Sequence, residues 1–464
     1  MTLPPYMTAA AIAGGVAAGE MSAVEVVRGH LERIERLNPL LNAYTDITAR
    51  RALRQAAEID RRRTAGQAVG PLAGVPFAVK NLFDVEGLTT RAGSKINREN
   101  PPAGADAELV RRLEAAGAVL LGALNMGEYA YDFTGENAHH GACRNPHDAD
   151  RMSGGSSSGS GAATAAGLAP LSLGSDTNGS IRVPASLCGI FGLKPTYGRL
   201  TRHGTFPFVD SLDHLGPFAR SVGDLALAYD AMQGPDPRDP VVAGRPAEPI
   251  TATLGHGIEG LRIAIAGGWF DTGGLPDAAA AVEAAANGLG ADRTVEVPGA
   301  EAGRAAAFII TNAESAALHL NRLRQRPDDF DPDTRDRFLA GAMLPAGWLV
   351  RAQQVRRWYL EQVMALFRDV DLLIAPSTPF SAPLIGQKTM ELRGEELSVR
   401  PNLGLFTQPI SCIGLPVAAT PIECGTAMPI GVQIIAPPWR EDLALRAARH
   451  LEREGVAAAR TPKL

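Results

Sequence analysis

The stretch that decides the fold is residues 168–182, which read LAPLSLGSDTNGSIR. Its first part, residues 168–173, is apolar and predicts a buried strand. Its second part is a turn of small residues that places several backbone N–H groups just before the hydroxyl of Ser180. Donors arranged in this way can stabilise an oxyanion, so Ser180 is a candidate nucleophile for acyl transfer. On this loop alone, an ordinary Asn-Gly turn explains the residues equally well.

A second run of small residues, SGGSSSGSG at 153–161, has three further interpretations. A flexible linker would separate domains, but an Ala-rich segment suited to a helix and then an apolar strand follow this run at once. A phosphate-binding loop would end in Gly-Lys-Ser or Gly-Lys-Thr, which is missing here. The spacing Gly155-x-Ser157-x-Gly159 fits a nucleophile elbow, which requires a strand directly before it. Because residues 148–151 read DADR, we predict no strand there and disfavour the elbow.

The candidate general base is Lys80, which lies in the apolar run VPFAVKNLFD at 75–84. This run predicts a buried strand. Burial removes water from a lysine and disfavours its ammonium form, so a neutral amine is expected near neutral pH. The alternative is an edge lysine whose charged end reaches solvent. None of the nine histidines has a context typical of a general base, and His139, His140 and His147 cluster in a turn-rich loop.

Helical and strand patterns alternate along the rest of the chain, which predicts an α/β fold. Ser22 is a candidate helix N-cap, with Glu25 three residues on. Helices are expected within 8–38 and at 46–64, 106–117 and 443–454; strands at 118–122, 261–266, 371–376 and 430–435; and a surface loop over 234–260. Residues 301–368 are helical and densely charged, with no chemistry attached to them. We expect one domain over 1–464, with a core at about 70–220, this helical layer, and C-terminal strands and a helix at about 370–455.

Charge and composition favour a small polar substrate. Lysine and arginine number 45 against 50 aspartate and glutamate, so the chain lacks the basic field that nucleic acid or an anionic membrane would need. The four cysteines are sparse and never spaced as C-x-x-C, which argues against a disulfide framework and a structural zinc site. The N-terminus shows no secretory signal, and no run approaches the roughly 18 apolar residues of a membrane span. We therefore expect a cytoplasmic protein.

Several motifs together resemble the amidase signature family. They are Gly154-Gly155-Ser156-Ser157, residues 173–184, residues 188–196, Val79-Lys80, residues 376–379, residues 414–416 and residues 429–433. The resemblance leaves only about 235–360 without a family pattern. It implies a mixed central β-sheet covered by α-helices on both faces.

The resemblance also implies a Ser–Ser–Lys triad. Ser180 attacks the amide carbonyl, Ser156 is held through a cis peptide and relays the proton, and neutral Lys80 is the final base. The backbone N–H groups of Thr177, Asn178, Gly179 and Ser180 hold the oxyanion. Asp176, Arg182 and Ser157 support the loop, and Tyr131 and Asp132 line the acyl pocket. No cofactor and no metal are expected.

Two positions depart from the family pattern; the first leaves Lys80 as the candidate base, and the second narrows the subfamily. Asn81 follows the lysine where the family often has Asp, and Asn178 stands where it often has Gly. Within the family, Asn178 and residues 129–141 resemble those of enzymes that act on small ureides, and this resemblance implies release of ammonia from a small ureide-type amide. The alternatives are the glutaminase subunit of a tRNA-dependent amidotransferase, a general aliphatic or aryl amidase, and, outside enzymes, an inactive amidase-like scaffold or an anion-binding module. An oligomeric state with a small helical partner subunit is also implied, with no direct contact to nucleic acid or membrane.

Overall fold

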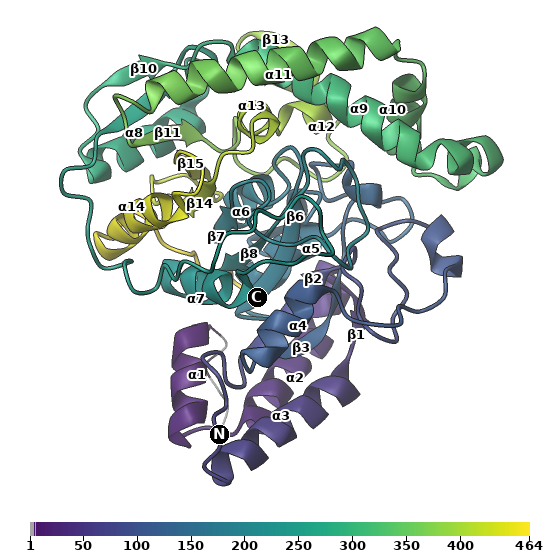
Figure 1. Ribbon diagram of the computed structural model, residues 1–464, viewed down its shortest axis with the longest axis vertical. Helices are drawn as coiled ribbons and strands as arrows, with labels where there is room; N and C mark the ends of the chain where they lie inside the picture. Colours follow the sequence, from purple (N-terminus) through teal and green to yellow (C-terminus); the bar gives the residue numbers. More distant parts are fainter. Residues whose placement is uncertain (1–3, 5) are drawn as a thin grey trace.

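The computed structural model describes residue 4 and residues 6–464, and its backbone is one mixed 11-stranded sheet with helices packed on it (Figure 1). The strand order is β1-β3-β2-β6-β8-β7-β14-β15-β11-β9-β10. The strands are β1 (Tyr44–Ile47), β2 (Pro76–Lys80), β3 (Val119–Leu124), β6 (Leu171–Asp176), β7 (Phe191–Lys194), β8 (His214–Ala219), β9 (Ile263–Gly267), β10 (Thr294–Glu296), β11 (Leu372–Pro376), β14 (Val417–Pro421) and β15 (Gly431–Ile435). The expected mixed sheet is confirmed.

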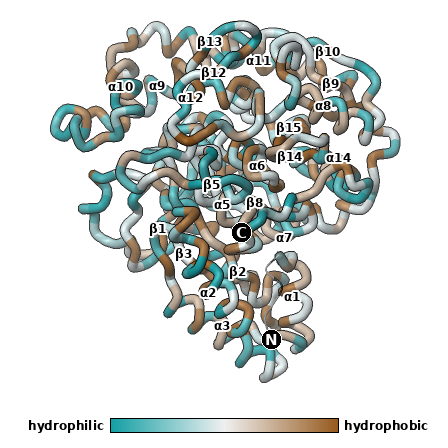
Figure 2. The backbone as a smooth tube through the Cα atoms, turned by 180° about the vertical axis from the view of Figure 1, so that it is seen from behind, coloured by the Kyte–Doolittle hydropathy of each residue, from teal (hydrophilic) through white to brown (hydrophobic). Residues whose placement is uncertain are grey.

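The central strands are buried along their whole length. Every residue of β2, β3, β6, β7, β8, β11, β14 and β15 is buried, which explains why their sequences are continuous apolar or small runs rather than alternating ones. In Figure 2, apolar segments follow strands such as β3, while hydrophilic segments gather in outer loops. A strand of this kind places any polar residue it carries in the interior.

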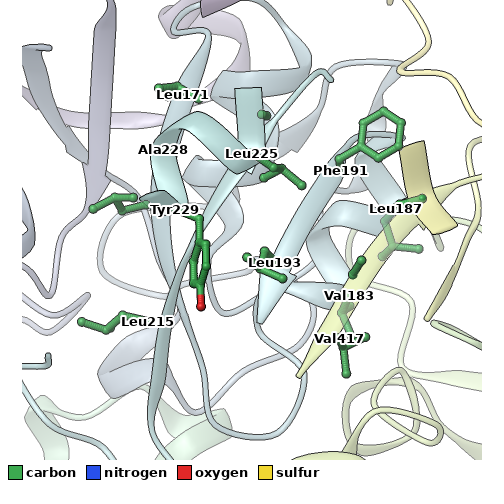
Figure 3. Close-up of a cluster of buried hydrophobic side chains, with 14 of the residues drawn as sticks. Leu171, Val183, Leu187, Phe191, Leu193, Leu215, Leu225, Ala228, Tyr229 and Val417 are labelled. Atoms are coloured by element: carbon green, nitrogen blue, oxygen red, sulfur yellow. The ribbon is translucent and has the colours of Figure 1, made fainter. Parts of the chain in front are cut away.

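Helices cover both faces of the sheet. The N-terminal helices are α1 (Ala9–Ala18), α2 (Ala23–Leu41), α3 (Ala49–Thr64) and α4 (Glu108–Ala115); the central ones are α5 (Ser158–Ala165), α6 (Arg182–Cys188), α7 (Val222–Met232) and α8 (Pro276–Leu289); and α14 (Glu441–Arg453) closes the chain. The predicted N-cap is confirmed, because the Ser22 hydroxyl accepts from the backbone N–H of Glu25. Figure 3 shows how α7 and α6 pack on β7: Leu225 and Tyr229 lie near Leu193, and Leu187 lies near Phe191.

A separate layer of helices covers one side of the molecule. It consists of α9 (Ala300–Gln325), α10 (Pro332–Ala342) and α11 (Ala346–Leu366), drawn together in green in Figure 1. The predicted helical character of 301–368 is confirmed. Helix α9 packs on α10, α11 and the short α13 (Gln408–Cys412), and α12 (Val399–Asn402) lies near this layer.

The prediction that residues 148–151 form no strand is wrong. They belong to β5 (Asp148–Met152), which pairs with β4 (Arg144–Asn145) in a two-stranded sheet of its own. The physical reason is that this ribbon lies outside the central sheet and is only partly buried, so its strands carry no apolar pattern. Ser157 nevertheless does not sit on an elbow. Its hydroxyl donates to the Ser175 carbonyl at 3.1 Å, so it ties α5 to β6.

The structure contains no helix, among the residues it describes, with the length and apolar character that a membrane crossing requires.

Candidate active site

A buried lysine and two serines meet where β2 and β6 lie side by side. Lys80 is the last residue of β2, and Ser175 follows the β6 residues that pair with β2. The fully buried Lys80 Nζ donates to Ser156 Oγ at 2.7 Å and to Ser175 Oγ at 2.9 Å. The Gly155–Ser156 peptide is cis, as the resemblance implied. The parallel pairing of β2 with β6 therefore brings Lys80 to Ser175, 95 positions away, and the segment before α5 adds Ser156, 76 positions away.

Burial sets the charge state of Lys80. Loss of hydration lowers the pKa of Lys80 to about 7, and the nearby carboxylates of Asp213, Asp176 and Asp132 oppose this shift. No carboxylate forms an ion pair with Lys80 among the described residues, since Ser156 and Ser175 are its hydrogen-bond partners. Near neutral pH the amine is therefore partly neutral and able to accept a proton.

The Ser180 loop presents unused hydrogen-bond donors. It connects β6 to α6, and the N–H groups of Ile181 and Arg182 donate to the Asp176 carboxylate at 3.1 and 3.4 Å. By contrast, the N–H groups of residues 177–180 donate to no described residue. Gly179 has φ +143°, and a Cβ there would lie 2.1 Å from the Thr407 hydroxyl, so only glycine fits. The loop therefore offers a run of free N–H donors around the Ser180 hydroxyl.

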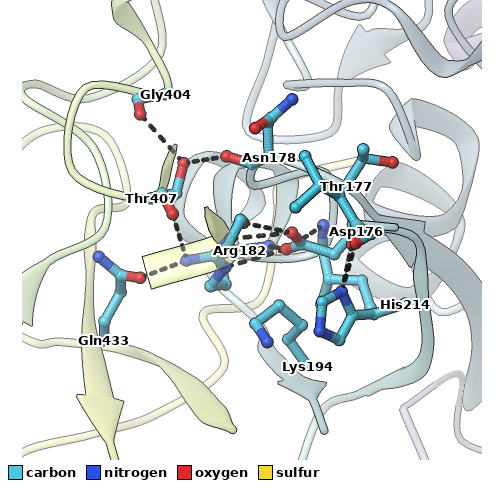
Figure 4. Close-up of polar contacts among 12 residues, drawn as sticks. Asp176, Thr177, Asn178, Arg182, Lys194, His214, Gly404, Thr407 and Gln433 are labelled. Atoms are coloured by element: carbon cyan, nitrogen blue, oxygen red, sulfur yellow. Dashed lines mark hydrogen bonds and ion pairs between the residues drawn. The ribbon is translucent and has the colours of Figure 1, made fainter. Parts of the chain in front are cut away.

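A fully buried ion pair holds this loop. Arg182 binds both carboxylate oxygens of Asp176, at 2.8 and 2.9 Å (Figure 4). Although burial disfavours the charged carboxylate, the guanidinium holds the pKa of Asp176 below its ordinary value. Arg182 also donates to the Thr407 carbonyl at 2.9 Å and to Gln433 Oε1 at 2.7 Å. The arginine thus joins the loop to the C-terminal third of the chain.

A small pocket opens beside Ser180, and its wall brings together residues from distant parts of the chain. They include Tyr131, Asn178, Phe308, Thr311, Arg337 and Gln408. Asp132 also lines the pocket, next to Tyr131. Sequence reasoning placed Tyr131, Asp132, Asn178 and Ser180 here. It missed the contributions of α9, α10 and α13, because nothing in a charged helical pattern marks which helix face meets a site.

Asp132 has its carboxylate already occupied. Its oxygens accept from the backbone N–H of Thr134 at 2.9 Å and of Gly135 at 2.6 Å, from the Thr134 hydroxyl at 2.8 Å, and from Arg400 at 2.5 Å. These four donors leave little capacity for a substrate N–H, although Asp132 lines the pocket as expected. Asp132 instead shapes the turn that follows Tyr131.

Arg337 is a cation without a carboxylate partner among the described residues. It lies 3.5 Å over the Tyr131 ring centroid and donates to the Tyr131 carbonyl at 3.0 Å. Tyr131 is held in turn by a hydrogen bond from its hydroxyl to Asn312 on α9. Arg400, by contrast, is paired with Asp132 and Asp333. Of these two arginines, Arg337 is the one available to an anionic group in the pocket.

The fold and this site define an amide hydrolase, and the chain belongs to the amidase family, whose sequence model matches residues 25–445. The resemblance inferred from the motifs is confirmed. The chain is 58% identical to AtzE, the 1-carboxybiuret hydrolase subunit of Pseudomonas sp. (strain ADP), over 96% of this chain and 97% of that protein. It is 38% identical to one subunit of the glutamyl-tRNA(Gln) amidotransferase of Chloroflexus aggregans (strain MD-66 / DSM 9485), over 100% and 99% of the two chains.

Two solved structures of related proteins also resemble this chain over nearly its full length. One, described as a vestigial protein complex that reveals the evolutionary origins of an s-triazine catabolic enzyme, is 57% identical with a TM-score of 0.97, over 98% of this chain and 100% of its own. A 6-aminohexanoate cyclic dimer hydrolase is 30% identical with a TM-score of 0.88, over 99% of both chains.

The buried ion pair yields a stability prediction. Arg182→Leu leaves the Asp176 carboxylate buried and uncompensated, so we expect the free energy of unfolding to fall by about 3–5 kcal/mol. Replacing both residues by Leu removes the orphan charge and should recover part of this loss. Urea unfolding followed by circular dichroism measures both effects. A loss below about 1 kcal/mol in the single variant would contradict the structural role of the pair.

Proposed function

We propose that this protein releases ammonia from a small ureide by means of Ser180, Ser156 and Lys80. The observation that carries the proposal is the 2.7 Å contact between the buried Lys80 amine and Ser156, next to a serine loop with free N–H donors. Lysine supplies the basicity that histidine supplies in other serine hydrolases.

The reaction proceeds in two steps, acylation of Ser180 and hydrolysis of the acyl-enzyme. Ser180 Oγ attacks the carbonyl carbon, its proton passes to Ser156 Oγ, and the proton of Ser156 passes to neutral Lys80. The N–H groups of residues 177–180 hold the oxyanion, and each such donor is typically worth about 3 kcal/mol in the transition state. Collapse breaks the C–N bond, and the proton returns through Ser156 to the leaving nitrogen, which departs as ammonia. Water then cleaves the acyl-enzyme by the same route.

The substrate we favour is 1-carboxybiuret or a close ureide. One support is the 58% identity to a chain of 1-carboxybiuret hydrolase. The other is Arg337 in the pocket wall, which has no carboxylate partner within the described chain and suits a substrate carboxylate through charge-assisted hydrogen bonds. The glutaminase alternative is favoured by the 38% identity to the amidotransferase chain. A glutamine side chain, however, has a CH₂ group next to the carbonyl that is attacked, where a ureide has an N–H.

We further propose that a small helical subunit covers part of the α10–α11 layer. Met343, Trp348 and Val350 are 77%, 56% and 59% exposed, which is unusual for large apolar side chains so close in the chain. A similar solved chain comes from a structure described as a protein complex.

The first prediction about the proposed function concerns pH. Protonation removes the base, so the rate of covalent labelling of Ser180 by a fluorophosphonate should fall about tenfold per pH unit below about 7 and level off above it. Lys80→Ala should lower the rate by a factor of about 10³ or more, and Ser180→Ala should abolish labelling. Lys194→Met is the matched control: burial also lowers the pKa of Lys194 to about 7, yet this variant should keep the acid limb. If the Lys194 variant loses the acid limb, the limb reports the titration of Lys194 and not of Lys80, and the prediction is wrong.

The second prediction concerns the carboxylate. Arg337→Met should lower kcat/KM for 1-carboxybiuret relative to uncharged biuret by about 10- to 100-fold, the effect of one lost charge-assisted hydrogen bond. Arg335→Met removes a charge from the same helix outside the pocket and should leave this ratio near the wild-type value. Equal losses on both substrates would count against a carboxylate-binding role for Arg337.

The third prediction concerns the partner. Native mass spectrometry of the protein purified from its own cells should show a complex heavier than the 48.7 kDa chain by one small subunit. Changing Met343 and Trp348 to Glu should dissociate that complex. Changing Leu40 and Ile47 to Glu, which are also exposed apolar residues but lie on α2 and β1, should not. Dissociation in both double variants would refute the assignment of the surface.

A further inference from the structure

We propose that helix α9 sets the substrate specificity of the pocket by fixing the orientation of two carboxamides, those of Asn178 and Gln408. One presents a hydrogen-bond acceptor and the other a donor, which together match the N–H and C=O groups of a ureido unit. The inference rests on the proposed ureide hydrolysis and names the groups that would recognise the substrate.

Asn178 supplies the acceptor. Its Nδ2 donates to the Thr311 hydroxyl at 2.8 Å, so the amide oxygen is the end left free. Oδ1 is buried and has no hydrogen-bond partner among the described residues, in a side chain whose residue is 8% exposed and lines the pocket with Ser180. A buried oxygen without a partner is costly, and a substrate N–H would remove that cost. The main chain is fixed as well, since the Thr407 hydroxyl donates to the Asn178 carbonyl at 2.7 Å (Figure 4).

Gln408 supplies the donor. Arg304 Nε donates to Gln408 Oε1 at 2.8 Å, which fixes the oxygen on the arginine and leaves Nε2 as the free end. Nε2 donates to no described residue, and Gln408 lines the same pocket. Arg304 is itself anchored to Asn402 Oδ1 at 2.8 Å and lies over the Phe308 ring.

The two orienting residues lie on one face of α9. Arg304, Phe308 and Thr311 are spaced i, i+4 and i+7, the positions that share a helix face. Phe308 lines the pocket between the two polar contacts in sequence. Helix α9 thus orients both carboxamides, although it belongs to the helical layer for which the sequence indicates no chemistry.

The pair distinguishes a ureide from an ordinary amide. In a ureide an N–H follows the carbonyl that is attacked, whereas an aliphatic amide has a CH₂ group there. An acceptor aimed at this position favours the N–H and is left unpaired by the CH₂. Asp132 is a poor candidate for this role because its carboxylate already accepts four hydrogen bonds. The next carbonyl of the ureide then faces the Gln408 donor.

Biuret and malonamide test the acceptor, because they differ only in an N–H against a CH₂ between two carboxamides. Asn178→Leu should lower the ratio of kcat/KM for biuret to that for malonamide by about 10- to 100-fold. Thr311→Val frees the amide to rotate and should lower this ratio by about 3- to 10-fold, while Thr311→Ser restores it. Ser315→Ala, which removes a buried hydroxyl one turn further along α9, is the matched control and should keep the ratio.

Propionamide, which lacks the second carbonyl, tests the donor. Gln408→Leu should lower kcat/KM for both biuret and malonamide relative to propionamide by about 3- to 10-fold. If wild type prefers biuret but neither Asn178→Leu nor Thr311→Val moves the biuret-to-malonamide ratio by more than about twofold, the inference fails while ureide hydrolysis stands. If wild type cleaves malonamide and not biuret, both the proposed ureide hydrolysis and this inference fail.

Discussion

The buried contact between Asp176 and Arg182 is the constraint on which the rest of the site depends. Both side chains are fully buried, and the guanidinium reaches beyond the loop to Thr407 and Gln433. Two charges in the interior are tolerated only when each is matched, and here the same arginine matches the carboxylate and binds oxygens of the C-terminal segment. The turn after β6 therefore cannot change shape without leaving a buried charge unpaired.

This rigid turn explains how the loop can keep free donors. Asp176 takes up the N–H groups of Ile181 and Arg182, and Thr407 holds the Asn178 carbonyl, so the loop is held without using the N–H groups of residues 177–180. The donors that remain are preorganised, which is the condition under which backbone dipoles stabilise a developing oxyanion most effectively. The same turn carries the Asn178 side chain into the pocket, so the proposed oxyanion donors and the proposed substrate acceptor share one support.

The helical layer and the central sheet contribute different parts of the site. The sheet places Lys80 beside Ser156 in an interior that removes water from the amine. Helices α9 and α10 bring Thr311 and Arg337 to the pocket wall, where we propose that they act on orientation and charge rather than on the reacting bond. Reaction and selectivity can then vary separately, because loss of a pocket contact does not disturb the buried lysine.

The sequence by itself determined the α/β class and the helical layer, and its resemblance to the amidase family added the mixed sheet and the proposed grouping of Ser180 with Lys80 and Ser156. The class and the helical layer follow from local signals, since apolar runs and helical periods are visible along the chain, whereas the triad rests on matching the family's motifs. The strand β5 was missed because a partly exposed ribbon has no apolar pattern. Only the tertiary structure decided that Asp132 is occupied by Arg400 and that Asn178 meets Thr311, 133 residues away. Such contacts depend on which helix face packs against the loop, and a helical period fixes the face of a helix but not the partner it meets.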